Sequence, residues 1–510
     1  MIAHLVSDAV TSPHGGLLIL VLALPVAALL LAFLAGGRHV ERIALVAVAV
    51  GAVLTVVVVR RMIESGDALV YVLGDWPPPL GIVLRADGLS AVMMAMTMVV
   101  LAAVALYARA DFATPTTERE RRAPFVFWTM LLAIWAALNV VFLAGDMFTL
   151  YVALELVTFA AVPLVSLDGK PEALQAALRY LMFALAGSVL YLVGTGLMYG
   201  TYGTMDIALI AQHIDAQPAV LAAVALMTVG LLAKTALFPL HLWLPPAHAG
   251  APAAGSALLS GLVVKGSFFI VVRLWLDAFA AVLTPGAAQL IAALGACAIV
   301  AGSAIALQQA RLKLMIAYST VAQIGYLFLM FPLVLLAVTP EAGAVALTGG
   351  MLQAVSHATA KAAMFMAAGL IYASLGHDRV SELTGLARTM PMTVAAFALG
   401  GFALIGLPPS SGFVAKWLLV SAALDSGQWW WVLVLAVGGL LTAVYVTQVL
   451  ARMLSPAATD AAMKPVARSR EAVVLALAAL SMLLALLAVA PVNIAELGRD
   501  VTAIDAGAQR

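Results

Sequence analysis

Two lysines and a proline-rich interruption occupy one strongly apolar segment, residues 233–265, which reads AKTALFPLHLWLPPAHAGAPAAGSALLSGLVVK. Lys234 ends an apolar run, and Pro239 should interrupt the helix there, because proline lacks a backbone donor and clashes with the preceding turn. Lys265 lies near the middle of the next apolar run. Charges in so apolar a segment predict a buried functional site, and the rest of the chain shows what surrounds it.

The composition identifies that surrounding as lipid. Of the 510 residues, 64% are hydrophobic and 10% are charged, against about 45–50% and about 25% in soluble globular domains. The net charge of +1 lacks the excess of basic residues that is typical of nucleic-acid-binding proteins. The one cysteine, Cys297, excludes disulfides, cysteine-ligated iron–sulfur clusters and cysteine-based zinc sites.

Apolar stretches of spanning length recur along the whole chain. The first, from about Gly16 to Ala35, lacks the basic flank of a signal peptide and is predicted to be a retained helix. The loop at residues 60–86 contains Gly-Asp-Trp-Pro-Pro-Pro between β-branched residues, which predicts an ordered turn or hairpin on the membrane surface. Hydropathy predicts about fourteen spans, centred near Leu24, Val50, Met96, Ala133, Ala160, Val189, Met227, Val264, Leu294, Ile324, Ala362, Leu407, Val437 and Leu480.

Basic residues fall mainly on one side of these spans. Loops on that side, from Arg38 and Arg42 to Arg468 and Arg470, hold about three times as many Lys and Arg as those on the other. By the positive-inside rule the basic side is cytoplasmic. We therefore expect a multi-pass protein of the inner (cytoplasmic) membrane with both termini outside the cytoplasm.

Some charges remain at membrane depth after this sorting. A charge at mid-membrane costs at least about 2.5–3.5 kcal/mol, so such groups pair, reach water or serve a function. One alternative is static ion pairing between helices, but one glutamate cannot neutralise four lysines. Arg179 and Arg273 lie near span ends, where snorkelling accounts for them, and Asp146 is placed to cap a helix. The five remaining charges are Glu155, Lys234, Lys265, Lys361 and Lys416.

Lysine is a suitable proton carrier in this setting. Burial and like-charged neighbours favour loss of its proton, whereas arginine stays charged. Glu155 can act as a gate, because a lysine close to its carboxylate holds its proton and a separated one releases it. We therefore predict that Glu155 and the four lysines translocate protons.

Other polar and helix-breaking residues accompany the lysines. Pro408, Pro409 and Gly412 precede Lys416, and paired interrupted spans in two halves of a chain predict an inverted-repeat transporter. For each helix alone, a packing kink without a pathway is the alternative. The segment around Lys361 contains no proline and predicts no clear break. Histidine titrates near neutral pH, which makes three residues candidate relays: His241, His248 and His357.

Cofactor motifs are absent from the sequence. The spacing of the histidines suggests no metal site, and there is no nucleotide, dinucleotide or haem motif. We therefore expect no cofactor and no catalytic or redox site in this chain. The energy for transport should come from an ion gradient or from partner subunits.

Together these residues resemble the antiporter-like subunit family, which includes Mrp-type multisubunit cation/proton antiporter subunits, proton-pumping membrane subunits of respiratory complex I, and related hydrogenase and carbon-uptake subunits. The resemblance rests on residues 233–265, 311–326, 357–369 and 406–416. It implies an all-α polytopic fold of about fourteen helices, in which helices 4–8 and 9–13 are inverted repeats and helices 7 and 12 are broken.

The resemblance also implies roles and limits. Glu155 matches the fifth-helix glutamate, and Lys234, Lys265, Lys361 and Lys416 match lysines of helices 7, 8, 11 and 12 along a hydrated axis. Gln323, a fourth possible relay, stands where many members have histidine, so the connection between the halves would depend more on water or His357. The implied parts are residues 1–110 (helices 1–3, with the surface loop 60–86), 111–280 (first repeat), 281–454 (second repeat) and 455–510 (loop and helix 14).

Several functions are compatible with this family. The length and the Gly-Asp-Trp-Pro segment most resemble the D-type Mrp subunit, which implies proton translocation in a multisubunit Na⁺/H⁺ antiporter with other membrane subunits as partners. The chain ends soon after helix 14, so we expect no long lateral helix. The alternatives are a pumping subunit of a complex I-like NADH:quinone oxidoreductase or a membrane hydrogenase, a membrane subunit of an inorganic-carbon uptake complex, and a scaffold with vestigial lysines.

Overall fold

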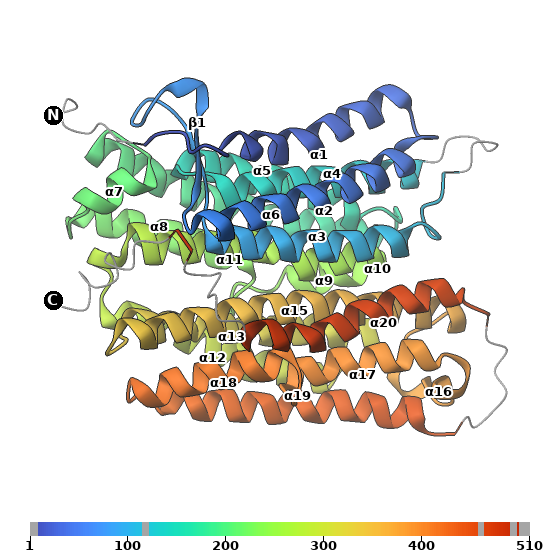
Figure 1. Ribbon diagram of the computed structural model, residues 1–510. Coiled ribbons are helices and arrows are strands. Elements are labelled where there is room, and N and C mark those ends of the chain that lie inside the picture. Colours follow the sequence, from blue (N-terminus) through green and yellow to red (C-terminus); the bar gives the residue numbers. More distant parts are fainter. Residues whose placement is uncertain (1–8, 115–121, 457–463, 490–496, 499–510) are drawn as a thin grey trace.

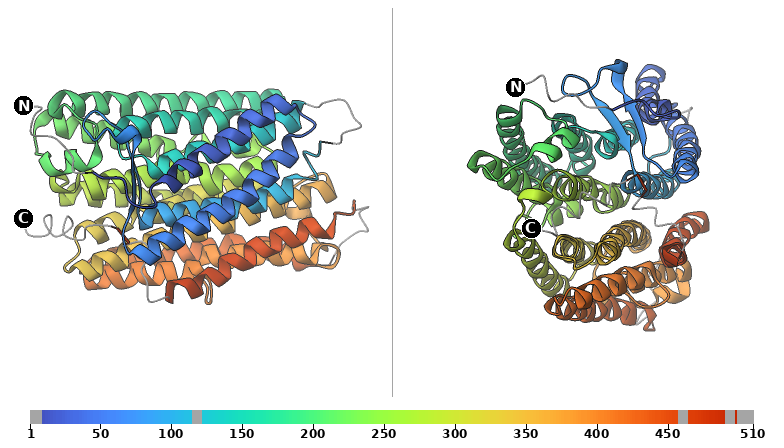
Figure 2. Two further views of the ribbon diagram at one scale, coloured as in Figure 1. Left: turned by 45° about the horizontal axis from the view of Figure 1, so that its top comes forward. Right: turned by 60° about the vertical axis from the view of Figure 1, so that its left-hand side comes forward.

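The computed structural model describes residues 9–114, 122–456, 464–489 and 497–498, and most of them are helical. The long helices run roughly side by side in one elongated bundle (Figure 1). Viewed closer to the helix axes, the helices from the first part of the chain and those from the second part form two neighbouring groups (Figure 2, right). The all-helical membrane fold predicted from the sequence is confirmed: thirteen helical stretches of the described chain are long and apolar enough to span a membrane.

The first part of the chain builds the group that begins with α1. Most of its helices are apolar throughout, as expected for segments surrounded by lipid and other helices. Its elements are α1 (Gly16–Ala35), α2 (Val40–Ser65), β1 (Leu69–Val72), η2 (Leu73–Asp75), β2 (Val83–Ala86), α3 (Gly88–Ala108), α4 (Arg122–Leu143), α5 (Met147–Val165), α6 (Pro171–Tyr202), α7 (Ile207–His213), α8 (Pro218–Thr235), α9 (Leu244–Gly250), α10 (Ala253–Leu258), η3 (Leu259–Val263), α11 (Val264–Arg273), η4 (Leu274–Ala278) and η5 (Ala280–Val282).

The second part builds the other group. Its last long helix, α20, packs against α17 and α15 and also against α3 of the first group, so it ties the two groups together. The elements are α12 (Pro285–Leu307), α13 (Leu312–Phe328), α14 (Met330–Leu335), α15 (Pro340–Leu375), η6 (Val380–Glu382), α16 (Leu386–Thr389), α17 (Pro391–Ile405), α18 (Ser411–Asp425), α19 (Trp430–Leu454), α20 (Arg468–Leu483) and η7 (Leu484–Val489).

Two predicted spans are interrupted, as the prolines suggested. α8 ends at Thr235, where Ala236 adopts a left-handed φ of 59°, and the chain resumes as α9 at Leu244. The span predicted around Leu407 is split into α17 and α18, because Gly406 takes a φ of 87° and two prolines follow. This split explains why the twelfth of the fourteen predicted spans is not one of the thirteen long helical stretches. The Lys361 span is the continuous helix α15.

The predicted hairpin forms at residues 69–86, but the loop is shorter than the expected 60–86, because residues 60–65 continue α2. β1 and β2 pair antiparallel, with Leu69 opposite Ala86 and Val72 opposite Val83. The strand β2 leads directly into Asp87, which caps α3 by accepting a hydrogen bond from the Ser90 amide. The hairpin therefore fixes the chain at the start of α3.

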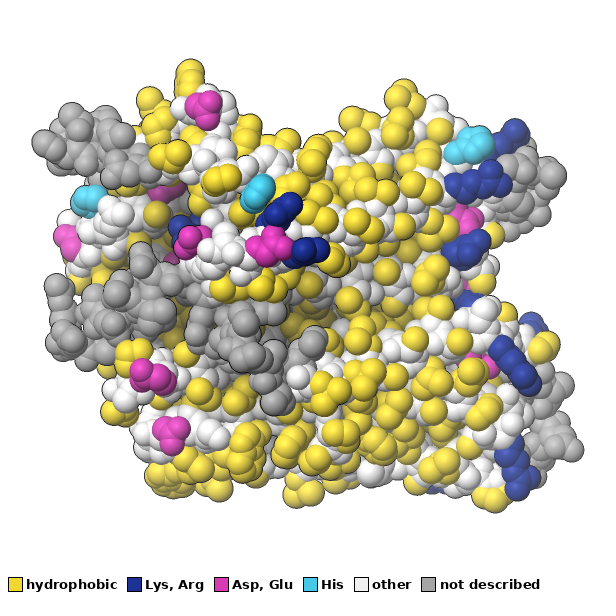
Figure 3. All heavy atoms as spheres, viewed as in Figure 1, with side chains coloured by type: hydrophobic (Ala, Val, Ile, Leu, Met, Phe, Trp, Pro, Cys, Tyr) yellow, Lys and Arg dark blue, Asp and Glu magenta, His cyan; other side chains and the backbone are white. Residues whose placement is uncertain are grey.

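Lys and Arg side chains gather mainly at one end of the bundle. Figure 3 shows them over the end where α2, α4 and α20 begin in Figure 1. At this end Arg109 donates to Glu41 at 3.2 Å, and Arg470 of α20 donates to Asp111 at 2.7 Å. The excess of basic residues that the sequence predicted on one side of the membrane thus lies at one end of the bundle. The predicted positions of the termini concern residues 1–8 and 499–510, which lie outside the described residues.

Candidate functional site

The first candidate pair, Glu155 and Lys234, lies between α5, α6 and α8. The Lys234 ammonium is 3.1 Å from a Glu155 carboxylate oxygen and 3.1 Å from the Thr158 hydroxyl. The Leu154 carbonyl accepts a further hydrogen bond at 3.3 Å, and Ser188 of α6 donates to Glu155. The structure therefore brings together the predicted gate and one predicted carrier.

Two glycines allow this close approach. Gly187 of α6 faces Gly230 of α8, and a Cβ atom added to Gly187 would stand 2.7 Å from the Gly230 carbonyl oxygen. Any larger residue would push the helices apart. The short α6–α8 separation lets Ser188 and Lys234 donate to the same carboxylate oxygen of Glu155.

The break after α8 has its own hydrogen-bond partner. The indole of Trp243 donates to the Ala233 carbonyl at 2.9 Å, and its ring stacks on Tyr180 with centroids 4.3 Å apart. Carbonyls at a helix end need such partners at membrane depth. Specific side-chain contacts thus stabilise the helix interruption next to Lys234.

Lys265 is completely buried in a helix that is irregular on both sides. The π-helical turns η3 and η4 flank α11, and the Lys265 ammonium donates to the Ser260 carbonyl within η3. Such π turns recur at functional sites. They were not predicted from the sequence, because an apolar run of this kind carries no clear signal for them.

Contacts of Ser260, Thr320 and Ile316 lie between Lys265 and Lys361. Lys265 bonds to the carbonyl of Ser260, and the next contact starts from the hydroxyl of the same residue. The Ser260 hydroxyl lies 3.1 Å from the Thr320 hydroxyl of α13, which donates to the Ile316 carbonyl at 3.0 Å. The Lys361 ammonium donates to the same carbonyl at 3.0 Å and also to Ser319. These contacts connect a lysine of the first group of helices to a lysine of the second.

Lys416 meets the end of a broken helix. Its ammonium donates to the Leu404 and Ile405 carbonyls, the last of α17, at 2.8 and 2.9 Å, and lies 4.3 Å from the centroid of the Tyr326 ring. Gln323 reaches the same Leu404 carbonyl at 3.4 Å. Gln353 of α15 donates to Gln323 at 3.1 Å.

The candidate relay histidines are buried. His357 lies one turn before Lys361 on α15, and both His248 and His357 are completely buried. His248 stacks on Phe365 with centroids 4.5 Å apart, whereas its ring nitrogens and those of His357 have no hydrogen-bond partner among the described residues. His241 stacks on Phe238 near the break after α8.

Static ion pairing between helices, the alternative to proton transfer, would explain the burial of one lysine. Within the described ranges, Lys234 is the only one of the four lysines that pairs with a carboxylate. The others donate to backbone carbonyls and hydroxyls. Asp146 caps α5 as predicted, accepting from the Phe148 and Thr149 amides.

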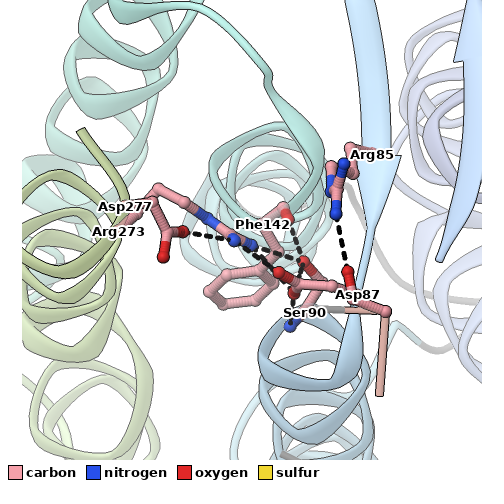
Figure 4. Close-up of polar contacts among 7 residues, drawn as sticks. Arg85, Asp87, Ser90, Phe142, Arg273 and Asp277 are labelled. Atoms are coloured by element: carbon pink, nitrogen blue, oxygen red, sulfur yellow. Dashed lines mark hydrogen bonds and ion pairs between the residues drawn. The ribbon is translucent and has the colours of Figure 1, made fainter. Parts of the chain in front are cut away.

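Arg273 corrects one expectation from the sequence. It does not snorkel to the interface, since it is 8% exposed and donates to Asp87 at 2.9 Å and to Asp277 at 2.8 Å. Figure 4 shows its guanidinium between these carboxylates, with Ser90 completing the cluster. Asp277 lies four residues after Arg273, a helical ion-pair spacing that could have revealed the cluster. The pairing with Asp87 joins α3 to the helix that carries Lys265.

We expect Asp87→Ala to lower the stability of the protein by about 3 kcal/mol, because it leaves a buried guanidinium without its main partner. The measurement is the melting temperature of the purified protein in detergent. Arg60→Ala is the control: it breaks an exposed pair with Glu64, and exposed pairs contribute little. Equal melting of Asp87→Ala and the parent protein would contradict the role assigned to this cluster.

Comparisons with known proteins agree with this architecture. Residues 144–442 match the family described as NADH:quinone oxidoreductase/Mrp antiporter, transmembrane. The N subunit of the NADH-quinone oxidoreductase of Desulforudis audaxviator is 35% identical over 77% of this chain and 77% of its own length. The D subunit of the Na⁺/H⁺ antiporter of Alkalihalophilus pseudofirmus is 31% identical over the same shares. A chain in the structure of the Mrp complex from Dietzia sp. DQ12-45-1b superposes with a TM-score of 0.85 at 25% identity, covering 98% of this chain and 100% of that one.

Proposed function

Because the chain belongs to the family of NADH:quinone oxidoreductase and Mrp antiporter transmembrane subunits, we propose that it is the proton-translocating subunit of a multisubunit Na⁺/H⁺ antiporter. The observation that carries the proposal is the set of four buried lysines with a single carboxylate partner among the described residues. Such groups are costly inside a membrane and mark ion pathways.

The proton path begins at the Glu155–Lys234 pair. While the carboxylate is 3.1 Å away, the ammonium is stabilised and Lys234 keeps its proton. Movement of α5 against α8 separates the pair and frees the proton. The broken helix after Lys234 supplies backbone that can adjust locally.

The path continues through Lys265 and Lys361 to Lys416. The hydroxyls of Ser260 and Thr320 lie between the first two of these lysines, and hydroxyls can both donate and accept protons. We take His248 and His357 as the relays of this link, since His357 lies one turn before Lys361 and His248 stacks on Phe365, four residues after Lys361. The path crosses between the two inverted repeats, which we place at residues 111–280 and 281–454.

We place the basic end of the bundle in the cytoplasm, which leaves both termini outside it. The antiporter assignment draws on the D-type relative and on the similarity over almost the full length to a chain of the Mrp complex. The other subunits of such a complex are the expected partners.

A pumping subunit of a complex I-like oxidoreductase is the second candidate. The relative at 35% identity belongs to such an enzyme and favours it. Proton movement along the same lysines would then be driven by redox chemistry in other subunits. Mass spectrometry of the subunits that co-purify with the chain separates the two candidates.

The proposed antiport predicts that the intact complex restores salt tolerance to a sensitive host and that Lys416→Ala abolishes this effect. Removing a positioned proton-transfer group should lower transport by roughly 100-fold. Lys464→Ala is the control, because Lys464 is exposed at the basic end. Unchanged salt tolerance with Lys416→Ala in an assembled complex would exclude the proposed path.

A further inference from the structure

A charged side chain from another helix contacts each end of the half-helix α17. At its C-terminal end lies the Lys416 ammonium, and at its N-terminal end lies the carboxylate of Glu471, a residue of α20. The helix has 15 residues, so about 22 Å separates the ends. α17 therefore lies between a buried cation and a buried anion.

The C-terminal end of α17 is negative in character. The last carbonyls of a helix have no donor from a following turn, and they sum to a partial negative charge. α17 stops at Gly406, and Lys416 takes up the carbonyls of Leu404 and Ile405. The partial negative charge at this end of α17 thus stabilises the Lys416 ammonium, as the Glu155 carboxylate stabilises the Lys234 ammonium.

The N-terminal end of α17 is positive in character and holds Glu471. One carboxylate oxygen of Glu471 accepts from the Thr393 amide at 3.1 Å and from the Thr393 hydroxyl at 2.7 Å. Glu471 is 6% exposed, so water screens this contact little. Its carboxylate also fixes α20 to the start of α17, and these helices pack against each other.

We propose that Glu471 is a positioning residue for Lys416, acting through α17. The carboxylate anchors the half-helix and complements its positive end, so that the free carbonyls at the other end are held against the ammonium. This inference rests on the proposed function, since it assigns Glu471 a part in the proton cycle of Lys416. It also gives the C-terminal helix a role in transport.

The test compares proton transport by the assembled complex carrying Glu471→Gln, Thr393→Asp, or both changes. Glutamine keeps an acceptor for the Thr393 amide but removes the charge, and we expect transport to fall about three- to tenfold, within the range of charge effects at helix ends. In the double variant, the aspartate introduced at position 393 returns a carboxylate to the same helix end, where it can accept from the glutamine amide introduced at position 471. We therefore expect the double variant to regain transport.

Asp111→Asn is the matched control, because it removes the carboxylate charge from the neighbouring Arg470–Asp111 contact of α20 without touching α17. It should leave transport close to that of the parent. Parental transport with Glu471→Gln, or a double variant that fails to assemble or assembles without regained transport, would overturn the inference. Lys416→Ala measured in parallel reports on the proposed function separately: if it retains transport, the function itself is wrong, whatever Glu471 does.

Discussion

Replacing Lys234 by methionine should lower proton transport by roughly 100-fold, because it removes a positioned proton-transfer group while preserving most of the side-chain volume. Glu155 would then lie in the interior without the ammonium now 3.1 Å away. An unpaired buried carboxylate is destabilising, so the protein should also melt at a lower temperature. Transport is measured in proteoliposomes with a pH-sensitive dye.

The double variant Glu155→Gln/Lys234→Met separates proton transfer from static pairing. Replacing a buried ion pair by neutral groups is often neutral or stabilising, so the double variant should regain the melting temperature of the parent. If the pair only holds α5 to α8, transport should return with the stability. We expect stability to return and transport to stay low, and recovery of both would contradict the proton path.

Substituting arginine for Lys361 should also abolish most transport, by roughly 100-fold. Arginine keeps the positive charge and the ability to donate to the Ile316 carbonyl, but it does not release a proton at physiological pH. A lysine needed only as a buried cation would tolerate this change. Proton uptake into vesicles, with the amount of assembled complex as reference, is the measurement.

Two further variants should be measured together with Lys361→Arg. Lys464→Arg makes the same substitution at an exposed position of the basic end and should transport normally. Thr320→Val removes one hydroxyl of the link between Lys265 and Lys361 and should slow transport without changing either lysine. Normal transport with Lys361→Arg would show that this lysine holds its proton permanently.

Residue chemistry alone predicted much of the candidate site. Glu155 and the four lysines stand out because each lies in an apolar run where a charge is costly. Pro239 and the pair at 408–409 predicted both breaks because proline cannot continue a helix. The hairpin at 69–86 also followed from local turn chemistry.

Arg273 shows where this local reasoning fails. Its position near a span end suggested snorkelling, yet its partner Asp87 lies 186 residues away in the sequence. The same limit applies to Glu471, which local sequence places merely at the start of a helix, although its carboxylate caps α17. Such contacts depend on helices that meet only after folding.

Hydropathy and charge are local properties that the bilayer selects directly. The residues alone therefore predict that the chain spans a membrane, about how many times it does so, and which charges lie in its interior. The partners of those charges became visible in the folded helix bundle: a carboxylate for Lys234, backbone carbonyls for Lys265 and Lys361, and a helix end for Lys416. Many of the groups around a buried charge come from helices distant in sequence, and close packing of those helices sets their distances.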